Sequence, residues 1–138
     1  MYLLNNYYNL ANSKKILIVD DDSFLLDMYS LKFSKSNFNV STALGPESAL
    51  EKLRQGLSPE IILLDIMMPV MDGFELFTKI KEENISPNSI VIFLSNRGQP
   101  SDITQAEFLG ASGYIVKASS TPSEVIDKVV NIINNIKK

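Results

Sequence analysis

Two short apolar runs of the sequence lead directly into acidic side chains. The run ILIV at residues 16–19 precedes Asp20, Asp21 and a third acid, and the run IILL at residues 61–64 precedes Asp65. Adjacent carboxylates repel one another, and capping the following helix would use only one of the three. Carboxylate oxygens are ligands that Mg²⁺ prefers. An Asp after a strand is often only a turn residue, but its carboxylate can also act as a nucleophile on phosphorus.

Two other apolar runs end in a hydroxyl and an ammonium group. The run IVIFLS ends in Ser95, and the run GYIVK ends in Lys117. A phosphoryl group in transfer needs cations and hydrogen-bond donors around its oxygens. We therefore expect Lys117 and Ser95 to contact the transferred group, with Asp65 as its acceptor. Asp20 and Asp21 would hold the metal.

A parallel sheet would bring these residues together. The predicted strands are residues 16–20, 38–43, 61–65, 90–95 and 113–117. The predicted helices run over residues 23–35, from 45–46 to 55–56, from about 72, over about 101–109, and from 120–122 to the chain end. Such alternation predicts an α/β fold with helices on both faces and right-handed crossovers. All strand carboxyl ends, and the polar residues that close them, then lie along one edge of the sheet.

Apolar spacing predicts the inward faces of the first and last helices. In the first helix the expected core residues are Leu25, Met28, Tyr29 and Phe33. In the last helix they are Val125, Val129, Ile132, Ile133 and Ile136, and Ile126 and Val130 widen the stripe beyond one core face.

Composition narrows the classes of function. The chain has 138 residues, a net charge of −3, no Cys and no His. It therefore lacks a disulfide framework, imidazole metal ligands and a phosphohistidine of its own. The mildly acidic balance argues against direct nucleic-acid binding. Residues 1–14 have neither the basic start nor the apolar core of a secretory signal, so we expect an N-terminal arm, a domain over 15–138, no membrane insertion and a cytoplasmic location.

Four motifs in order, ILIVDDD, IILLDIMMPVMDG, IFLS and GASGYIVK, resemble the receiver domain of two-component response regulators. The likeness covers about residues 15–137. It implies a flavodoxin-like, three-layer αβα sandwich with five parallel strands in the order 2-1-3-4-5 and five helices. The resemblance assigns the phosphoacceptor to Asp65, the switch hydroxyl to Ser95, the phosphate-pairing lysine to Lys117 and the rotating aromatic to Tyr114.

By the same resemblance, Mg²⁺ is the cofactor. Its ligands would be Asp20, commonly through water, Asp21, Asp65 and the backbone carbonyl of Met67. Before activation, packing of an aromatic side chain at a sheet edge also accounts for Tyr114, and the two interpretations are compatible.

Three positions depart from the family pattern. Asn96 follows the switch hydroxyl where a small residue is usual, and we expect it to narrow access to the acceptor. Met67 and Arg97 occupy the positions expected to tune dephosphorylation. Ala118 replaces the usual Pro after Lys117, and since a cis bond without Pro costs about 2.5–4 kcal/mol, we expect a trans Lys117–Ala118 bond.

The resemblance implies a stand-alone switch in a histidine-to-aspartate phosphorelay, and no output domain is expected after the last helix. It would not be an enzyme beyond its own phosphorylation and slow dephosphorylation. Its partner would be a sensor histidine kinase or a histidine phosphotransfer protein. Weak self-association is expected through the fourth helix, fifth strand and fifth helix.

Two alternatives remain open. One is a receiver-like adaptor that works without phosphorylation. The other is a metal-dependent phosphohydrolase, but such enzymes generally need a second acid two residues after the nucleophile, where this chain has Met67.

Overall fold

The computed structural model describes residues 13–136. Most of the predicted arm, residues 1–14, lies outside this range, and Lys14 is the first residue of a strand. Among the described residues, no helix is long and apolar enough to span a membrane.

The strands form one parallel sheet in the order β2-β1-β3-β4-β5, which confirms the predicted topology. The strands are β1 (Lys14–Asp20), β2 (Phe38–Leu44), β3 (Ile61–Leu64), β4 (Ile90–Ser95) and β5 (Gly113–Val116). The predicted boundaries differ from these by at most two residues. Asp65 and Lys117 each lie just past a strand rather than within it. Their side chains therefore need not point to one face of the sheet or the other, as side chains within a strand do.

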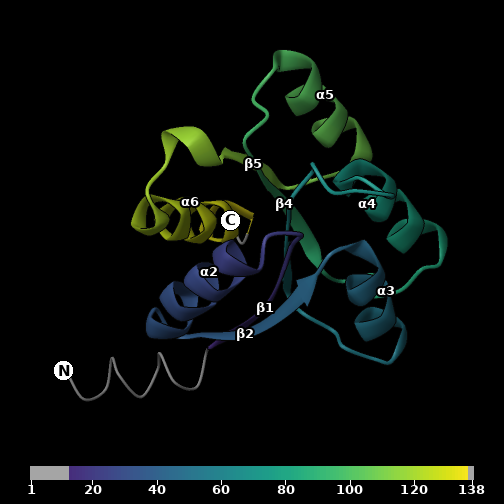
Figure 1. The fold of residues 1–138 in the computed structure, drawn as a ribbon, viewed down its shortest axis with the longest axis horizontal. Coiled ribbons are helices and arrows are strands. Elements are labelled where there is room, and N and C mark those ends of the chain that lie inside the picture. Colours follow the sequence, from purple (N-terminus) through teal and green to yellow (C-terminus); the bar gives the residue numbers. More distant parts are fainter. Residues whose placement is uncertain (1–12, 137–138) are drawn as a thin grey trace.

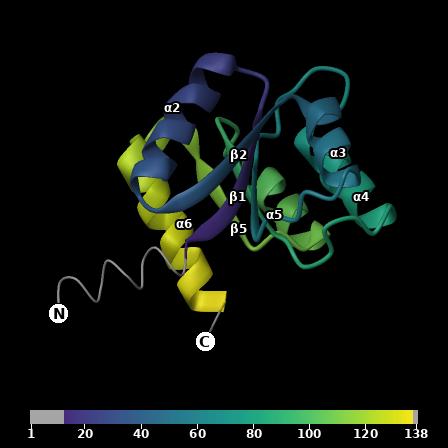
Figure 2. The ribbon, with the colours of Figure 1, turned by 90° about the horizontal axis from the view of Figure 1, so that it is seen from below.

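Five α-helices cover the sheet in two layers, as predicted. They are α2 (Ser23–Lys35), α3 (Pro46–Arg54), α4 (Gly73–Glu82), α5 (Pro100–Leu109) and α6 (Pro122–Ile136). Figures 1 and 2 show α2 and α6 on one face of the sheet and α3, α4 and α5 on the other. The flavodoxin-like three-layer sandwich is thereby confirmed.

The central strand β3 explains why the sheet is buried on both faces. Ile62 and Leu64 belong to the core beneath α3, α4 and α5, whereas Ile61 and Leu63 belong to the core beneath α2 and α6. All four side chains are at most 1% exposed. An apolar run without alternation is what a strand covered on both sides requires.

The inward faces of two helices were predicted only in part. In α2, Leu26 is buried, while the predicted Leu25 and Met28 are only partly buried. Helix α2 contacts both the sheet and α6, so its buried stripe is wider than one sheet-facing row. The predicted helical spacing was right, but the stripe was centred one residue away.

In α6 the predicted stripe was wrong at its edges. Ile126 is only 9% exposed and belongs to the core, so it does not widen an exposed surface. Ile136, predicted to point inward, is 50% exposed in the last described turn. Val130 is 39% exposed, as the widening of the stripe implied.

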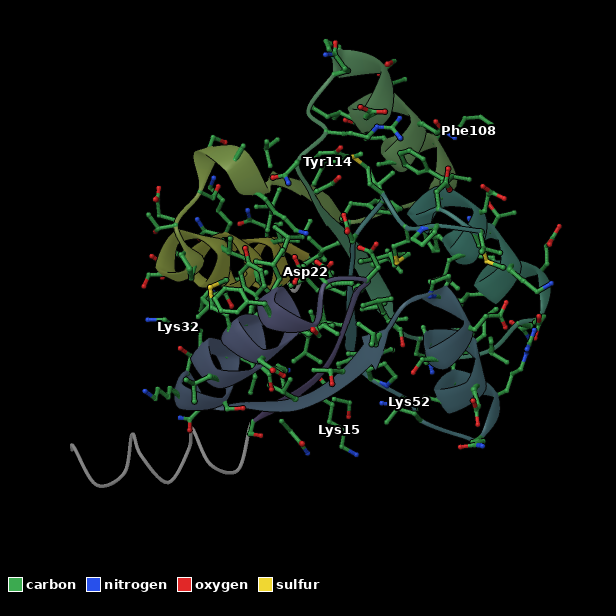
Figure 3. All side chains as sticks on the ribbon, viewed as in Figure 1. Lys15, Asp22, Lys32, Lys52, Phe108 and Tyr114 are labelled. Atoms are coloured by element: carbon green, nitrogen blue, oxygen red, sulfur yellow. The ribbon has the colours of Figure 1, made fainter. Side chains whose placement is uncertain are left out.

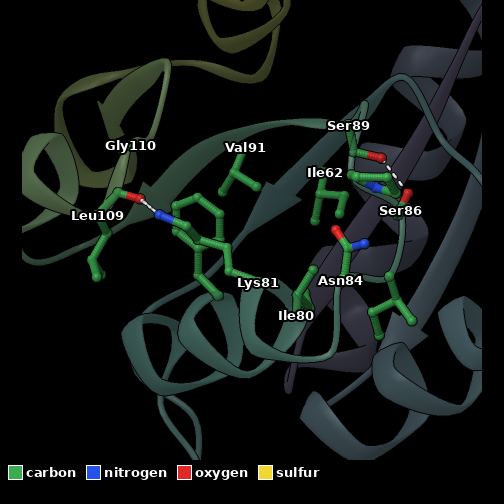
Figure 4. A pocket seen from close by; sticks show the side chains of 12 residues that line it. Ile62, Ile80, Lys81, Asn84, Ser86, Ser89, Val91, Leu109 and Gly110 are labelled. Atoms are coloured by element: carbon green, nitrogen blue, oxygen red, sulfur yellow. Dashed lines mark hydrogen bonds between the residues drawn. The ribbon is translucent and has the colours of Figure 1, made fainter.

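A cavity of about 320 Å³ lies at the amino-terminal edge of the sheet, away from the predicted site (Figure 4). It lies between α4 and α5, and Ile62 and Val91 are among its lining residues. Lys81 Nζ donates a hydrogen bond across it to the carbonyl of Leu109 (Figure 4). This contact joins the carboxyl ends of α4 and α5.

Candidate phosphoacceptor site

Strand register brings the acidic side chains of two strands together. Val19 pairs with Leu64, so Asp20 at the end of β1 and Asp65 just after β3 are the next residues in register. The backbone N–H of Asp65 donates to the carbonyl of Val19 at 3.0 Å, which fixes that alignment. Asp20 is 3% exposed and Asp65 is 6% exposed. Two carboxyl groups thus lie side by side in a nearly buried position.

Lys117 supplies the positive charge that this pair requires. Its Nζ lies 2.6 Å from Asp20 Oδ2 and 3.6 Å from Asp65 Oδ2, and its side chain is 8% exposed. Burying charges is costly unless they are paired and hydrogen-bonded. Burial alone would lower the pKa of Lys117, but the hydrogen bond to Asp20 and the charges of Asp65 and Asp20 raise it. The ammonium group is therefore fully protonated and closer to Asp20 than to the predicted acceptor.

Burial raises the pKa of the Asp65 carboxyl from 3.8 to about 6. The Lys117 charge lowers this pKa and the Asp20 charge raises it, while the N–H groups of Ile66 and Met67 lower it. At neutral pH the carboxylate is still the main form. A carboxylate held in this way, close to a cation and poorly solvated, is chemically available as a nucleophile.

The three consecutive acids after β1 have different roles. Asp22 is the N-cap of α2, because its side chain accepts hydrogen bonds from the N–H groups of Phe24 and Leu25 at 2.9 and 3.2 Å. Asp20 accepts a hydrogen bond from the N–H of Asp22 at 3.0 Å, and Asp21 is exposed. Capping therefore accounts for Asp22 alone and leaves Asp20 and Asp21 for another purpose.

The loop between β3 and α4 is folded tightly against the acceptor. The N–H of Gly73 donates to the carbonyl of Ile66 at 2.8 Å. A Cβ at Gly73 would lie 2.2 Å from the carbonyl oxygen of Asp65, so only glycine fits here. Asp72 caps α4 in a capping box with Glu75. The sequence DG after the acceptor strand thus sets the path of the backbone that carries Asp65.

The acidic residues of this edge fit a hard divalent cation. Asp20, Asp21 and Asp65 each offer a carboxylate oxygen, and these atoms lie within 4.8 Å of one another. A cavity of about 170 Å³ opens over them, and Met67 and Asn96 are among its lining residues. An all-oxygen donor set of this kind suits Mg²⁺ rather than softer metals. Asn96 lies at the cavity wall, where the sequence predicted that it would restrict access.

Ser95 in β4 and Tyr114 in β5 both contact Arg97, which lies in the loop after β4. Ser95 is 0% exposed, and its Oγ accepts a hydrogen bond from the N–H of Arg97 at 3.3 Å. The hydroxyl of Tyr114 donates to the carbonyl of Arg97, and its ring lies 6.3 Å from that of Phe93. Figure 3 shows Tyr114 beside α5. The aromatic predicted to rotate inward therefore already contacts this loop.

The Lys117–Ala118 bond is trans, since no cis peptide occurs between residues 13 and 136. That prediction is confirmed. Lys117 begins a short 3-10 turn, Lys117–Ser119, which leads the chain away from the site toward α6.

An ion pair beside the site was not anticipated from the sequence. Arg97 Nη2 lies 2.6 Å from Oδ1 of Asp102, whose side chain is 5% exposed. From the sequence, Arg97 was assigned only a position expected to tune dephosphorylation, and Asp102 lay in a predicted helix with no role assigned to it. An acid in the first turn of a helix is common, and nothing in its spacing indicates that it is buried.

The sequence of residues 16–130 matches the family model of the response regulator receiver domain. This chain belongs to that family.

The receiver domain is 35% identical over 115 residues to the chemotaxis protein CheY of Thermotoga maritima. The matched region covers 83% of this chain and 92% of CheY. It is 36% identical over 121 residues to a protein-glutamate methylesterase/protein-glutamine glutaminase of Halalkalibacterium halodurans, over 86% of this chain and 34% of that protein. It spans about half the length or less of several relatives, including the regulator ResD of Bacillus subtilis at 48%.

Solved structures share the fold of the receiver domain. The chemotaxis protein CheY4 of Vibrio cholerae has a TM-score of 0.79 at 25% identity, covering 87% of this chain and 98% of that one. The BeF3-activated DrrB receiver domain has a TM-score of 0.73 at 27% identity, covering 88% and 98%.

Proposed function

We propose that this receiver domain is a Mg²⁺-dependent phosphoacceptor switch in a histidine-to-aspartate phosphorelay, with Asp65 as the acceptor. The observation that carries this proposal is the grouping of Asp65 with Asp20, Asp21 and Lys117 at the carboxyl edge of the sheet. One buried carboxylate lies 3.6 Å from an ammonium group, and two more acids lie beside it.

Asp20, Asp21, Asp65 and the carbonyl of Met67 would hold the cation. Mg²⁺ bound there would neutralise negative charge on the phosphoryl oxygens. Met67 is 56% exposed, and its neighbour Asp65 accepts hydrogen bonds from the backbone of this loop. The loop therefore presents backbone groups as well as a carboxylate to the cavity.

The chain's own residues would carry out the transfer. A carboxylate oxygen of Asp65 forms a bond to phosphorus as the bond from phosphorus to the donor nitrogen or oxygen breaks. An imidazole leaving group takes up a proton, whereas an acyl phosphate leaves a carboxylate that needs none. The phosphoryl group of the product carries about −1.5 to −2 of charge, by analogy with other phosphorylated side chains, in place of the single negative charge of the carboxylate. Lys117 then pairs with the phosphoryl group, and Ser95 donates its hydroxyl hydrogen to it.

The phosphoryl group must come from another molecule, because the chain has no His. A sensor histidine kinase, a histidine phosphotransfer protein or a small acyl phosphate could supply it. The protein would act as a switch rather than as an enzyme on a separate substrate, without direct nucleic-acid contact, and a cytoplasmic location remains part of this proposal. That it works without an attached output domain stays a prediction.

Phosphorylation is proposed to change the surface formed by α5, β5 and α6, where a partner or a second copy would bind. Ser95 joins that surface through Arg97 and Tyr114. Of the two α6 residues expected to offer apolar area for self-association, Val130 is exposed, whereas Ile126 lies in the core. We propose a weak homodimer that strengthens on phosphorylation.

Phosphotransfer from a small acyl phosphate, followed by intact-protein mass spectrometry, tests this function. The parent protein should gain one phosphoryl group only with Mg²⁺. Asp65→Asn should gain none, Asp21→Ala should lose most of the rate and its Mg²⁺ dependence, and Ser95→Ala should still be labelled. Asp27→Ala, which removes an exposed acid on α2, is the matched control. A parent protein that is never labelled would favour the phosphorylation-independent adaptor.

A further inference from the structure

The loop after β4 is held by three contacts that all involve Arg97. Its N–H donates to Ser95 Oγ at 3.3 Å, and its carbonyl accepts from the hydroxyl of Tyr114. Its guanidinium group reaches Oδ1 of Asp102 at 2.6 Å. Arg97 therefore contacts the end of β4, the side chain of Tyr114 in β5 and the first turn of α5 at once.

Asp102 is held in an unusual way for a carboxylate. The residue is 3% exposed, and its Oδ2 has no hydrogen-bond partner among residues 13–136. Its Oδ1 accepts the hydrogen bond from Arg97. Buried polar groups without partners are rare and call for an explanation. Position in the first turn of α5 offsets part of the cost, because the helix amino terminus favours negative charge.

The half-satisfied carboxylate makes the Arg97–Asp102 pair hard to break. If Arg97 withdrew, Asp102 would keep a buried charge without this ion pair, which is strongly unfavourable. Arg97 loses less, since its side chain is 43% exposed and water can solvate it. A displacement of the Arg97 backbone is therefore expected to move the first turn of α5 rather than to separate the pair.

We propose that the Arg97–Asp102 pair is the connector that transmits movement of Ser95 to α5, with Asp102 as a positioning residue. This inference rests on the proposed function of Asp65. When Ser95 turns its hydroxyl toward the phosphoryl group, the hydrogen bond from the N–H of Arg97 draws the loop with it. Asp102 follows Arg97, and α5 shifts as a unit. The carbonyl of Arg97 keeps Tyr114 on the same moving loop.

The pair differs in this respect from the other arginine ion pair that joins two segments. Arg54 and Glu83 lie 2.5 Å apart, with side chains 44% and 31% exposed. Neither group touches the residues of the candidate site, and water can replace either partner. An exposed pair of this kind contributes little to stability and transmits little. It is the natural control.

Backbone amide NMR of the 138-residue protein, with Mg²⁺ and beryllofluoride as the acyl phosphate analogue, tests the connector. In the parent protein, amide signals of Asp65 and Ser95 and those of Ala106 and Gly110 at the far end of α5 should all shift. In Asp102→Asn and in Arg97→Gln the Asp65 and Ser95 signals should still shift. The α5 shifts should fall about threefold or more, as expected when the coupling between two sites is cut.

Three comparisons separate coupling from simple damage to the fold. Arg97→Lys keeps the charge and should restore most of the α5 response. The double variant should respond no less than each single variant, since both remove the same link. Arg54→Gln should behave as the parent does. Two single variants are used so that loss of folding in one, seen by circular dichroism, leaves the other decisive.

Each other outcome overturns the connector. Parent-like α5 shifts in a folded Asp102→Asn or Arg97→Gln protein would show that the pair transmits nothing. Loss of the Asp65 shifts in these variants would show that the pair serves binding instead. If the amide signal of Ser95 shifts in the parent protein while the signals of α5 do not, then α5 does not move with Ser95. A parent in which even Asp65 does not respond would also contradict the proposed phosphoacceptor function.

Discussion

The carboxyl of Asp65 is an acid whose pKa rises on folding, from 3.8 to about 6. The folded protein therefore binds this proton more tightly than the unfolded chain. Stability decreases as pH rises between these two values, and the penalty is fully present at pH 7. This is the reverse of an ordinary surface acid, whose pKa falls when it gains a partner. The ionised acceptor is retained at the expense of stability, as is common at functional sites.

We predict that Asp65→Asn stabilises the metal-free protein at pH 7. The amide removes the ionisation penalty, worth about 1–2 kcal/mol after allowance for solvent screening. The gain should disappear near pH 4, where Asp65 is protonated in the folded parent. Urea unfolding in chelator at both pH values measures this. Adding Mg²⁺ should reverse the order, because only the parent keeps the full ligand set.

Asp27→Asn on the exposed side of α2 is the control, with little change expected at either pH. An Asp65→Asn protein that is less stable than the parent at pH 7 in chelator would be inconsistent with a penalised carboxylate. So would a gain of the same size at pH 4.

At the scale of elements, the β3–α4 loop contains a residue with strained backbone. Val70 has φ of 73°, and the N–H of Met71 donates to the carbonyl of Pro69 at 2.8 Å. This is a γ-turn with positive φ at its centre, which is rare and strained. Val70 is 94% exposed, so no packing compensates for placing a β-branched residue there. The strain lies in the loop that follows the acceptor.

We predict that Val70→Gly raises the free energy of unfolding by about 1 kcal/mol. Relief of the left-handed strain, about 1–2 kcal/mol, exceeds the entropy that glycine adds to the unfolded chain. Equilibrium denaturation measures the change. Asn88→Gly, at an exposed loop position without positive φ, should instead be destabilising. Equal losses in both variants would show that the turn at Val70 is not strained.

The same loop gives an opposite prediction for Gly73. Ala at this position would place a Cβ 2.2 Å from the carbonyl oxygen of Asp65, so the start of α4 or the acceptor backbone must move. We expect a loss of about 2–3 kcal/mol and slower phosphorylation. Gly98→Ala, whose Cβ would meet the side chain of Val116 with a methyl carbon nearest at 3.1 Å, should cost less. Neutral behaviour of Gly73→Ala in denaturation and labelling would rule out this close approach.

Sequence patterns predicted the elements better than their contacts. The strand IILL was recognisable because a strand covered on both faces needs no alternation, and DG after it marked the start of α4. The inward face of α2 was predicted one residue away, because helical spacing does not show that α2 also packs against α6. The Arg97–Asp102 pair could not be predicted from the sequence for the same reason, since it is a tertiary contact. Side-chain pairing across a loop leaves no periodic signal.

At the scale of the whole molecule, we predict that the proposed homodimer is weak and depends on α6. Val130→Glu should reduce association with and without beryllofluoride, because it puts a charge on the exposed apolar side of that helix. Sedimentation velocity across a concentration series measures it. Phe24→Ser removes an apolar side chain that is 74% exposed on α2, which is not one of the three elements of this surface, and should have no effect. A parent protein that stays monomeric under all conditions would exclude the dimer.

Phosphorylation and the proposed response to it involve different parts of the molecule. The carboxyl edge of the sheet holds the acids and Lys117, and the α5–β5–α6 side carries the proposed response. The loop from Ser95 to Asp102 joins them. Since phosphorylation, transmission and association depend on different residues, each can be lost while the others remain.

The position of the phosphoryl group tests the central claim most directly. After phosphorylation with an acyl phosphate and Mg²⁺, borohydride reduction converts an aspartyl phosphate to homoserine, which peptide mass spectrometry locates. We predict homoserine at position 65 alone, and none in a sample from which Mg²⁺ was removed. Homoserine at Asp20 or Asp21, or a phosphoryl label on Asp65→Asn at the parent's rate, would contradict the assignment of Asp65 as the acceptor.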